Sequence, residues 1–330
     1  RTCLEFRRVL SDLAAAADPC DDLGAGSAGR RRAEGLIVHM TLKTPMRSMK
    51  KTLVLIAAAA GLTLSAGPVL AAGGGGHHLR DGGFSFEGPF GSFNQGQLQR
   101  GYKVYREVCA SCHSMNLMHF RTLAEPGGPF YDVDQVSPAE NRFVRALAKE
   151  VQIADIDTET GEPVMRDGTP ADRFPSPYPN ATAAAAANGG AAPPDLSVMA
   201  KARHGGANYI YSLLTGYKTP PAGLQMRPGQ NYNEYMSGDL TPFVAEGAHV
   251  PPGGFIAMPN PLQNGQVTYD DGTAPTVENY AKDVAAYIAW ASDPKQVARK
   301  RAGVGTLIFL FLFAGVTYLS YRRIWKGVAH

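Results

Sequence analysis

Cysteine and histidine come together in one short run of this chain. Cys109, Cys112 and His113 form a Cys-x-x-Cys-His motif at residues 109–113. This spacing is the attachment signature of a c-type haem. Two thiols three positions apart can reach the two vinyl groups on one porphyrin edge, and the histidine can then give the iron one axial nitrogen. The motif therefore predicts one covalently attached haem c.

Two other uses of the same motif are open. A thiol redox pair also uses Cys-x-x-Cys, and a zinc site could use it as half of a ligand set. Zinc would need a second ligand pair, and the remaining cysteines, Cys3 and Cys20, precede the expected mature chain. Haem attachment is therefore the preferred interpretation.

The N-terminal residues predict processing rather than a folded domain. Residues 46–51 are basic, 53–64 are apolar but too few to cross a bilayer, and 69–72 offer small residues for cleavage. This order is typical of a secretory signal peptide, which we place at 46–71. We expect residues 1–45 to be a mistranslated upstream segment; the alternative is a genuine cytosolic extension.

A second membrane signal lies near the C-terminus. Residues 302–321 are twenty consecutive residues without a charge. A helix of that length spans about 30 Å, the thickness of the hydrocarbon core. Basic residues flank both ends, and Tyr318, Tyr321 and Trp325 are placed as interfacial anchors. We expect residues 294–330 to form a transmembrane anchor with a short cytoplasmic tail, rather than a buried core helix.

The two membrane signals predict that residues 72–293 form a periplasmic domain on a single-pass anchor in the bacterial inner (cytoplasmic) membrane. This domain holds 15 Lys and Arg against 23 Asp and Glu, a net charge of −8. Such a charge excludes nucleic acid as a partner and attracts basic proteins. Acidic residues are densest at 155–172, which is either a solvated loop or a docking surface for a basic electron carrier.

Hydrophobic spacing predicts a mostly helical domain with one core. The expected helices cover residues 98–110, 139–151, 181–188, 208–214 (helix or turn) and 277–292. Residues 154–180 and 218–275 are expected to be irregular, apart from a strand and Asp-Gly turn at 266–272. Gly101 and Tyr105 share one helix face, which favours close contact with a second helix.

The second axial ligand decides between electron transfer and small-molecule chemistry. A methionine there would fill the last coordination position of the iron and raise its reduction potential. Met258 is preferred, since Phe-Ile-Ala-Met-Pro-Asn-Pro would hold its thioether in a stiff, water-poor loop. Met226 and Met236 follow it, and an ordinary gap-filling role is the alternative for each. His204 and His249 are the candidates for a bis-histidine site.

Seven segments of the expected mature chain, one of which contains the haem motif, resemble a known family. They are FSFEGPFGSF at 84–93, GYKVYREVCASCH at 101–113, YPNATAAAAANGGAAPPDLS at 178–197, KARHGGANYIYSLLTGY at 201–217, IAMPNP at 256–261, TYDDGT at 268–273 and AKDVAAYIAWASDPKQVARKR at 281–301. Through these segments the chain resembles the cytochrome c1 family, the haem subunit of quinol–cytochrome c reductase, in its bacterial form. The resemblance implies a cytochrome c-like helical fold with family insertions.

The resemblance also implies roles for the residues that match. Cys109 and Cys112 would hold haem c through thioethers, with His113 as the proximal ligand and Met258 as the distal one. Some bacterial relatives carry an added cysteine pair near the methionine loop, whereas no cysteine follows Cys112 here. Packing and proline alone would therefore hold this loop.

Four further residues match positions around the haem in this family. Arg203 would pair with a haem propionate, unless it is an ordinary surface arginine. Asn188 and Tyr209 resemble polar residues near the propionates, and Pro194 belongs to a stiff stretch of backbone beside the haem.

The function implied is a one-electron relay from the Rieske iron–sulfur protein to a soluble or membrane-bound cytochrome c. Cytochrome b and the lipid bilayer would be its other partners, and no bond-making reaction would occur on this subunit. Two rivals are a membrane-anchored haem peroxidase or dehydrogenase subunit with an open iron, and a zinc-stabilised adhesion domain.

Overall fold

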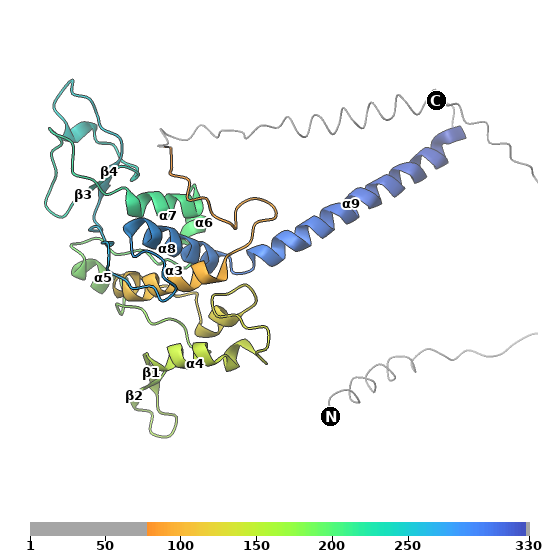
Figure 1. The fold of residues 1–330 in the computed structure, drawn as a ribbon, viewed down its shortest axis with the longest axis horizontal. Helices are drawn as coiled ribbons and strands as arrows, with labels where there is room; N and C mark the ends of the chain where they lie inside the picture. The colour runs from red at the N-terminus through yellow and green to blue at the C-terminus, as the bar shows by residue number, and fades with distance from the viewer. Residues whose placement is uncertain (1–77, 328–330) are drawn as a thin grey trace, which may run out of the picture. The chain divides into compact units, whose positions relative to one another are not determined.

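The computed structural model describes residues 78–327, so the expected signal peptide at 46–71 and the upstream segment 1–45 lie outside the described residues. The described chain is mostly helical, with two small antiparallel sheets (Figure 1). The α-helices are α3 Gln95–Glu107, α4 Arg142–Lys149, α5 Ala181–Ala187, α6 Met199–Ala202, α7 Gly206–Thr215, α8 Val277–Ser292 and α9 Gln296–Ile324. The strands are β1 Gln152–Ile156, β2 Pro163–Asp167, β3 Asn231–Asn233 and β4 Gly254–Ile256.

Helices α3 and α8 pack against each other at the centre of the domain. Gly101 allows this approach, because a Cβ on it would lie 2.1 Å from the carbonyl oxygen of Asp283 and 2.7 Å from the Cβ of Tyr287. The prediction that Gly101 meets a second helix is therefore confirmed. Beside this crossing, Arg100 donates to both carboxylate oxygens of the buried Asp283, at 2.7 and 3.2 Å.

The core is built around α8, which has the bounds expected from its spacing. Helices α6 and α7 pack on α8 beside α3, so the core lies among these helices. The largest side chains with almost no exposed surface include Trp290, Tyr280, Tyr287, Leu98 and Met115. One continuous cluster of buried residues joins these helices to the segments that precede and follow the haem motif.

One expected helix is much shorter in the structure. The helix expected at 139–151 begins as a short 3-10 turn, Pro138–Glu140, and α4 starts only after Asn141. The Asn141 side chain accepts hydrogen bonds from the amides of Phe143 and Val144, so it caps α4 rather than continuing a helix through this point.

Three expectations about strands are wrong. Residues 218–275 are not irregular throughout, because β3 and β4 pair over three residues each. Residues 154–180 do not form only loop, because β1 and β2 pair over five residues each to form a hairpin. Residues 266–272 contain the turn but no strand. There the hydroxyl of Tyr280 donates to the carbonyl of Val267 at 2.5 Å and accepts from its amide at 3.0 Å, so a side chain replaces the partner strand.

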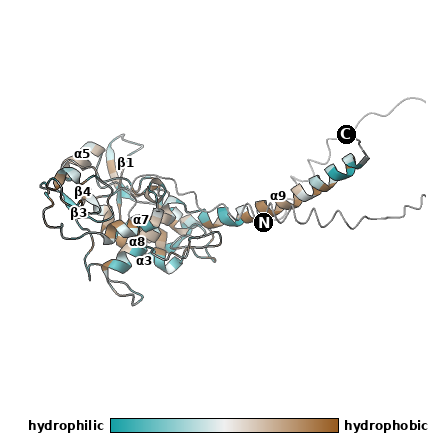
Figure 2. Ribbon diagram, turned by 90° about the horizontal axis from the view of Figure 1, so that it is seen from above, coloured by the Kyte–Doolittle hydropathy of each residue, from teal (hydrophilic) through white to brown (hydrophobic). Residues whose placement is uncertain are grey.

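Helix α9 contains the expected span, residues 302–321. Among the described helices it alone is long and apolar enough to cross a membrane, and its apolar residues are exposed in the isolated chain. Figure 2 shows the apolar stretch along α9 between more polar ends. A helix that is apolar on every face and covered by no protein matches a lipid-facing span rather than a core helix.

Candidate haem site

The Cys-x-x-Cys-His motif follows directly on α3. This helix ends at Glu107, and Cys109–Ser111 then form one 3-10 turn. The carbonyl of Cys109 accepts from the amides of Cys112, at 3.1 Å, and His113, at 2.8 Å. The motif is therefore folded into a compact turn, and both thiols are free and half-buried.

The chemistry of these thiols does not favour a redox pair. Burial raises the pKa of the Cys109 thiol to about 12, with a smaller contribution from Cys112. Reactive Cys-x-x-Cys pairs instead need a lowered pKa, because the thiolate is the nucleophile. Within residues 78–327, no group of three His, Cys, Asp or Glu side chains could hold a metal ion, so a zinc site also lacks its remaining ligands there.

One nitrogen of the His113 ring is held by the backbone. His113 Nδ1 lies 2.8 Å from the carbonyl oxygen of Pro194. A carbonyl only accepts, so Nδ1 carries the proton and Nε2 keeps a lone pair for a metal. Burial lowers the pKa of His113, which also favours the neutral, ligating imidazole.

The segment that contains Pro194 is fixed to the segment after the motif. Asp195 accepts from the hydroxyl of Ser114 and the amide of Asn116, both at 2.8 Å. The amide of Leu196 donates to the Ser114 carbonyl at 2.9 Å. We call this set the proximal clamp (114–117 with 194–197). It sets the position of the carbonyl that orients His113.

Met258 lies in the loop after β4 and is half-buried; like Cys109, it packs against the buried core cluster. Two contacts hold its backbone. The hydroxyl of Tyr217 donates to the Met258 carbonyl at 3.1 Å, and β4 pairs with β3 just before it. Tyr217 was not expected from the sequence, although its segment, 201–217, carries the family resemblance.

The other candidate axial ligands lie in different surroundings. Met226 and Met236 are half-buried, and the hydroxyl of Tyr209 lies 3.9 Å from the Met236 sulfur. His204 and His249 are exposed. A ligand must be kept close to a buried iron, so exposed histidines are weaker candidates than a thioether packed on the core.

The residues expected around the propionates are differently placed. Arg203 is exposed and, within the described part of the chain, pairs with no carboxylate; its guanidinium donates to the Ala202 carbonyl at 3.2 Å. Asn188 follows α5, and its side-chain amide donates to the Ala184 carbonyl at 2.7 Å and to the Tyr178 hydroxyl at 3.1 Å. The propionate roles of Arg203, Asn188 and Tyr209 stay predictions.

The acidic residues of 155–172 lie on and beside the β1–β2 hairpin. Arg166 pairs with two of them, since its guanidinium lies 2.5 Å from Asp155 and 2.7 Å from Asp172. Hydrogen bonding to Arg166 is the main cause that holds the pKa of Asp172 well below its usual range. Around the turn, Glu159 and Glu162 are exposed and Asp157 is half-buried, so the negative charge is concentrated there.

The donor set fits a covalently attached haem. It offers two free thiols on one turn, an imidazole with Nε2 available, and a thioether in a proline-flanked loop. Thiols add to vinyl groups, and imidazole with thioether is one of the axial pairs that haem iron uses in cytochromes. When bound, the haem supplies reversible one-electron oxidation and reduction.

Comparison with known proteins gives the same family. The Cytochrome C1 family pattern matches residues 84–328. Cytochrome c1 of Rhodospirillum rubrum is 40% identical over 288 residues, which cover 82% of this chain and 96% of that protein. Cytochrome c1 of Cereibacter sphaeroides is 41% identical over 304 residues, 85% of this chain and 97% of that protein.

A relative with a different layout is also similar. "Cytochrome b/c1" of Bradyrhizobium diazoefficiens is 43% identical over 261 residues, which cover 73% of this chain but only 35% of that protein. The family match spans the haem motif, the methionine loop and the membrane helix in one continuous stretch. This chain therefore belongs to the cytochrome c1 family of the bc1 complex, whose cofactor is a c-type haem.

Proposed function

We propose that this chain relays single electrons from the Rieske iron–sulfur protein to a cytochrome c within quinol–cytochrome c reductase. The observation that carries the proposal is His113, whose Nδ1 is held by the Pro194 carbonyl at 2.8 Å directly after two free thiols. An imidazole fixed in this way keeps Nε2 toward a metal in both redox states. Little rearrangement then accompanies each electron, which favours a relay.

Each protein group has one task in this proposal. Cys109 and Cys112 bind the haem covalently, so it stays with the domain in both redox states. His113 and Met258 would be the two protein ligands of the iron, and together they would leave no position for substrate. The rival with an open iron would need this thioether to lie elsewhere.

The remaining partners follow from the anchor and the relatives. Helix α9 supports a single-pass attachment to the bilayer, and the expected signal peptide supports a haem domain in the periplasm. The name of the Bradyrhizobium relative, which joins cytochrome b to c1, supports cytochrome b as a partner. The exposed acids around the β1–β2 turn support docking of a basic cytochrome c.

Rapid mixing of the intact complex with quinol tests the relay. We expect c-type haem to be reduced in the complete complex and to stay oxidised when the Rieske protein has been removed. Added ascorbate should still reduce the haem in the depleted complex, which controls for damage. Unchanged reduction by quinol without the Rieske protein would show that this chain takes its electrons from another donor.

A further inference from the structure

Residues 85–92, which we call the 85–92 loop, form a closed loop ahead of α3. The amide of Ser92 donates to the Ser85 carbonyl at 3.0 Å, and the Ser85 hydroxyl donates to the Ser92 carbonyl at 2.9 Å. Gly91 is needed for this turn, because a Cβ there would lie 2.0 Å from the carbonyl oxygen of Glu87. The loop therefore has a defined shape rather than a range of shapes.

The phenylalanines in and beside this loop have two kinds of surroundings. Phe84 and Phe86 are each 5% exposed, and Phe93 stacks on Phe86 with ring centroids 4.4 Å apart. Phe90 is 84% exposed. A single exposed apolar side chain is common and needs no explanation by itself. The position of Phe90 relative to α9 is what makes it informative.

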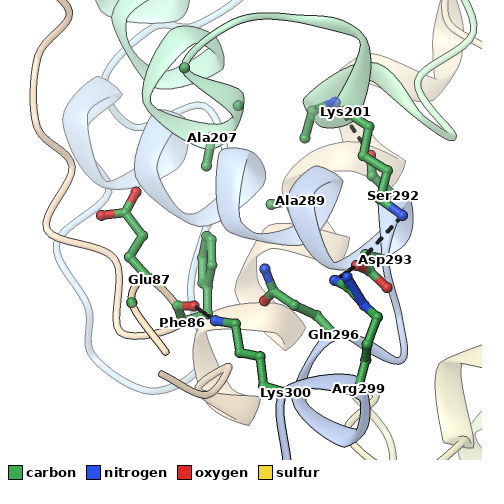
Figure 3. Close-up of a pocket in the computed structure, with 14 residues that line it drawn as sticks. Phe86, Glu87, Lys201, Ala207, Ala289, Ser292, Asp293, Gln296, Arg299 and Lys300 are labelled. Carbon is green, nitrogen blue, oxygen red and sulfur yellow. Dashed lines mark hydrogen bonds and ion pairs between the residues drawn. The ribbon is translucent and has the colours of Figure 1, made fainter. Parts of the chain in front are cut away.

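The loop is attached to the start of α9. Lys300 Nζ donates to the carbonyl of Phe86 at 2.7 Å, as Figure 3 shows. Beside this bond, Phe90 and its loop neighbours line a cleft of about 310 Å³ together with Arg301 and Val304 of α9. Val304 is already inside the uncharged run that begins at residue 302. The loop therefore reaches the level at which the membrane span begins.

The basic residues at the start of α9 differ in whether a carboxylate pairs with them. In the neighbouring cleft, Asp293 pairs with Arg299 and lies 3.5 Å from Lys201 (Figure 3). Lys300 and Arg301, in contrast, pair with no carboxylate in residues 78–327. Two uncompensated cations at the edge of a span are placed to meet lipid phosphates.

The two ends of the span also differ in their aromatic residues. The C-terminal end carries its own interfacial group, with the rings of Tyr321 and Trp325 6.2 Å apart. Residues 296–308, at the other end, contain no aromatic side chain. Membrane proteins place aromatic rings at both interfaces. Phe90 is the exposed aromatic ring that the loop places beside this end of α9.

We propose that the 85–92 loop is a second membrane contact, in which Phe90 enters the phospholipid interface and Lys300 and Arg301 meet the lipid phosphates. The proposal rests on α9 being a membrane span. It is carried by continuity between the loop and the lipid-facing helix, and by the unpaired basic residues beside them. Such a contact would hold the haem domain at two points, whereas the anchor alone would hold it at one.

A photo-crosslinking experiment tests this in native membranes that contain the whole complex. The photoreactive amino acid p-benzoylphenylalanine replaces Phe90 in one variant and Val136 in a matched control. Val136 is 90% exposed and does not line the cleft that Phe90 forms with α9. Attachment of haem c and reduction by quinol are measured first in both variants, to show that each has assembled.

After irradiation, we expect phospholipid adducts on the chain that carries the label at position 90. We expect no such adducts on the chain that carries it at position 136. Mass spectrometry of the isolated chain identifies the adduct. A crosslink from position 90 to cytochrome b or another polypeptide would overturn the proposal, because a protein would then be the occupant. Absence of any adduct at 90 would overturn it as well. Neither result depends on electron flow, so the proposed relay is tested separately.

Discussion

The two sides of the proposed haem site are held in different ways. On the His113 side, the proximal clamp joins 114–117 to 194–197 through side-chain and backbone hydrogen bonds, next to the packed helices α3 and α8. On the Met258 side, the Tyr217 hydroxyl and a sheet of two three-residue strands hold a loop. We infer that the histidine side sets whether the domain forms and the methionine side tunes the iron.

Disrupting the contact between α3 and α8 at Gly101 should have the largest effect on stability. Gly101→Val would place side-chain atoms where the Asp283 carbonyl oxygen lies, so we expect a loss of about 3 kcal/mol or more in the free energy of unfolding. Urea unfolding of the haem-loaded protein in detergent measures it. Gly96→Ala, in the same helix, is the control, because its new Cβ has no contact closer than 3.5 Å. Equal stability of the two variants would show that α3 and α8 are not in close contact.

Loss of the proximal clamp should come next. Asp195→Ala removes the acceptor for Ser114 and for the amides of Asn116 and Ser197, so we expect about 2 kcal/mol of destabilisation. The yield of attached haem should fall too, because the Pro194 carbonyl loses its fixed position. The haem content per chain and the urea midpoint measure both effects. A normal haem yield together with normal stability would contradict the role of the clamp.

The methionine side should respond in potential rather than in folding. Met258→Leu keeps the volume but removes the thioether, so the reduction potential should fall by a sizeable part of the about 0.8 V that axial ligands span. The iron should also begin to bind carbon monoxide. Redox titration and a carbon monoxide difference spectrum measure these changes. Met226→Leu and Met236→Leu are the controls. If either reproduced the effect while Met258→Leu did not, the ligand would have been assigned to the wrong loop.

A smaller effect is expected from the contact that holds the methionine loop. Tyr217→Phe leaves the ring in place but removes the hydroxyl that donates to the Met258 carbonyl, at a cost of about 1 kcal/mol. The ligand should then dissociate more often, so carbon monoxide should bind faster than in the parent. Stopped-flow mixing measures the rate. Tyr232→Phe, whose hydroxyl bonds Pro252 at 2.5 Å, is a control in the same region. Equal rates in all three proteins would show that Tyr217 does not steady the ligand.

The smallest effect should come from the ion pair between Arg166 and Asp172, on and beside the β1–β2 hairpin. The pKa of Asp172 is lowered in the folded chain, mainly by Arg166, so its contribution is present at neutral pH and lost as the pH falls below the ordinary carboxyl range. Asp172→Asn should therefore be slightly less stable than the parent at pH 7, and this difference should shrink below about pH 4. Urea unfolding across this range measures it, with Glu159→Gln as control. A difference that grew on acidification would contradict the ion pair.

The parts of the fold that the sequence predicts well depend on local spacing. The α8 pattern, the Gly101 contact and the apolar span each depend on one continuous segment of sequence, and each is confirmed. Attachment of haem at Cys109 and Cys112 stays a prediction. The β1–β2 hairpin was missed because both of its faces are mostly exposed, so it lacks the alternation of buried and exposed residues that marks a strand.

The missed features of the site depend on contacts between distant residues. Pro194 was expected only to stiffen the backbone. Its carbonyl instead accepts a hydrogen bond from the ring of His113, 81 positions away in the sequence. Tyr217 reaches Met258 across 41 positions, and Tyr280 replaces a strand partner for Val267. Such long-range hydrogen bonds leave no periodic pattern, so residue spacing could not have revealed them.

The most direct test of the account is a reduced-minus-oxidised spectrum of the gently purified protein with quinol as the only reductant. The account predicts that b-type haem co-purifies and that the c-type haem on this chain is reduced by quinol. A c-type haem that purifies with b-type haem, accepts electrons from ascorbate and yet stays oxidised with quinol would contradict the relay.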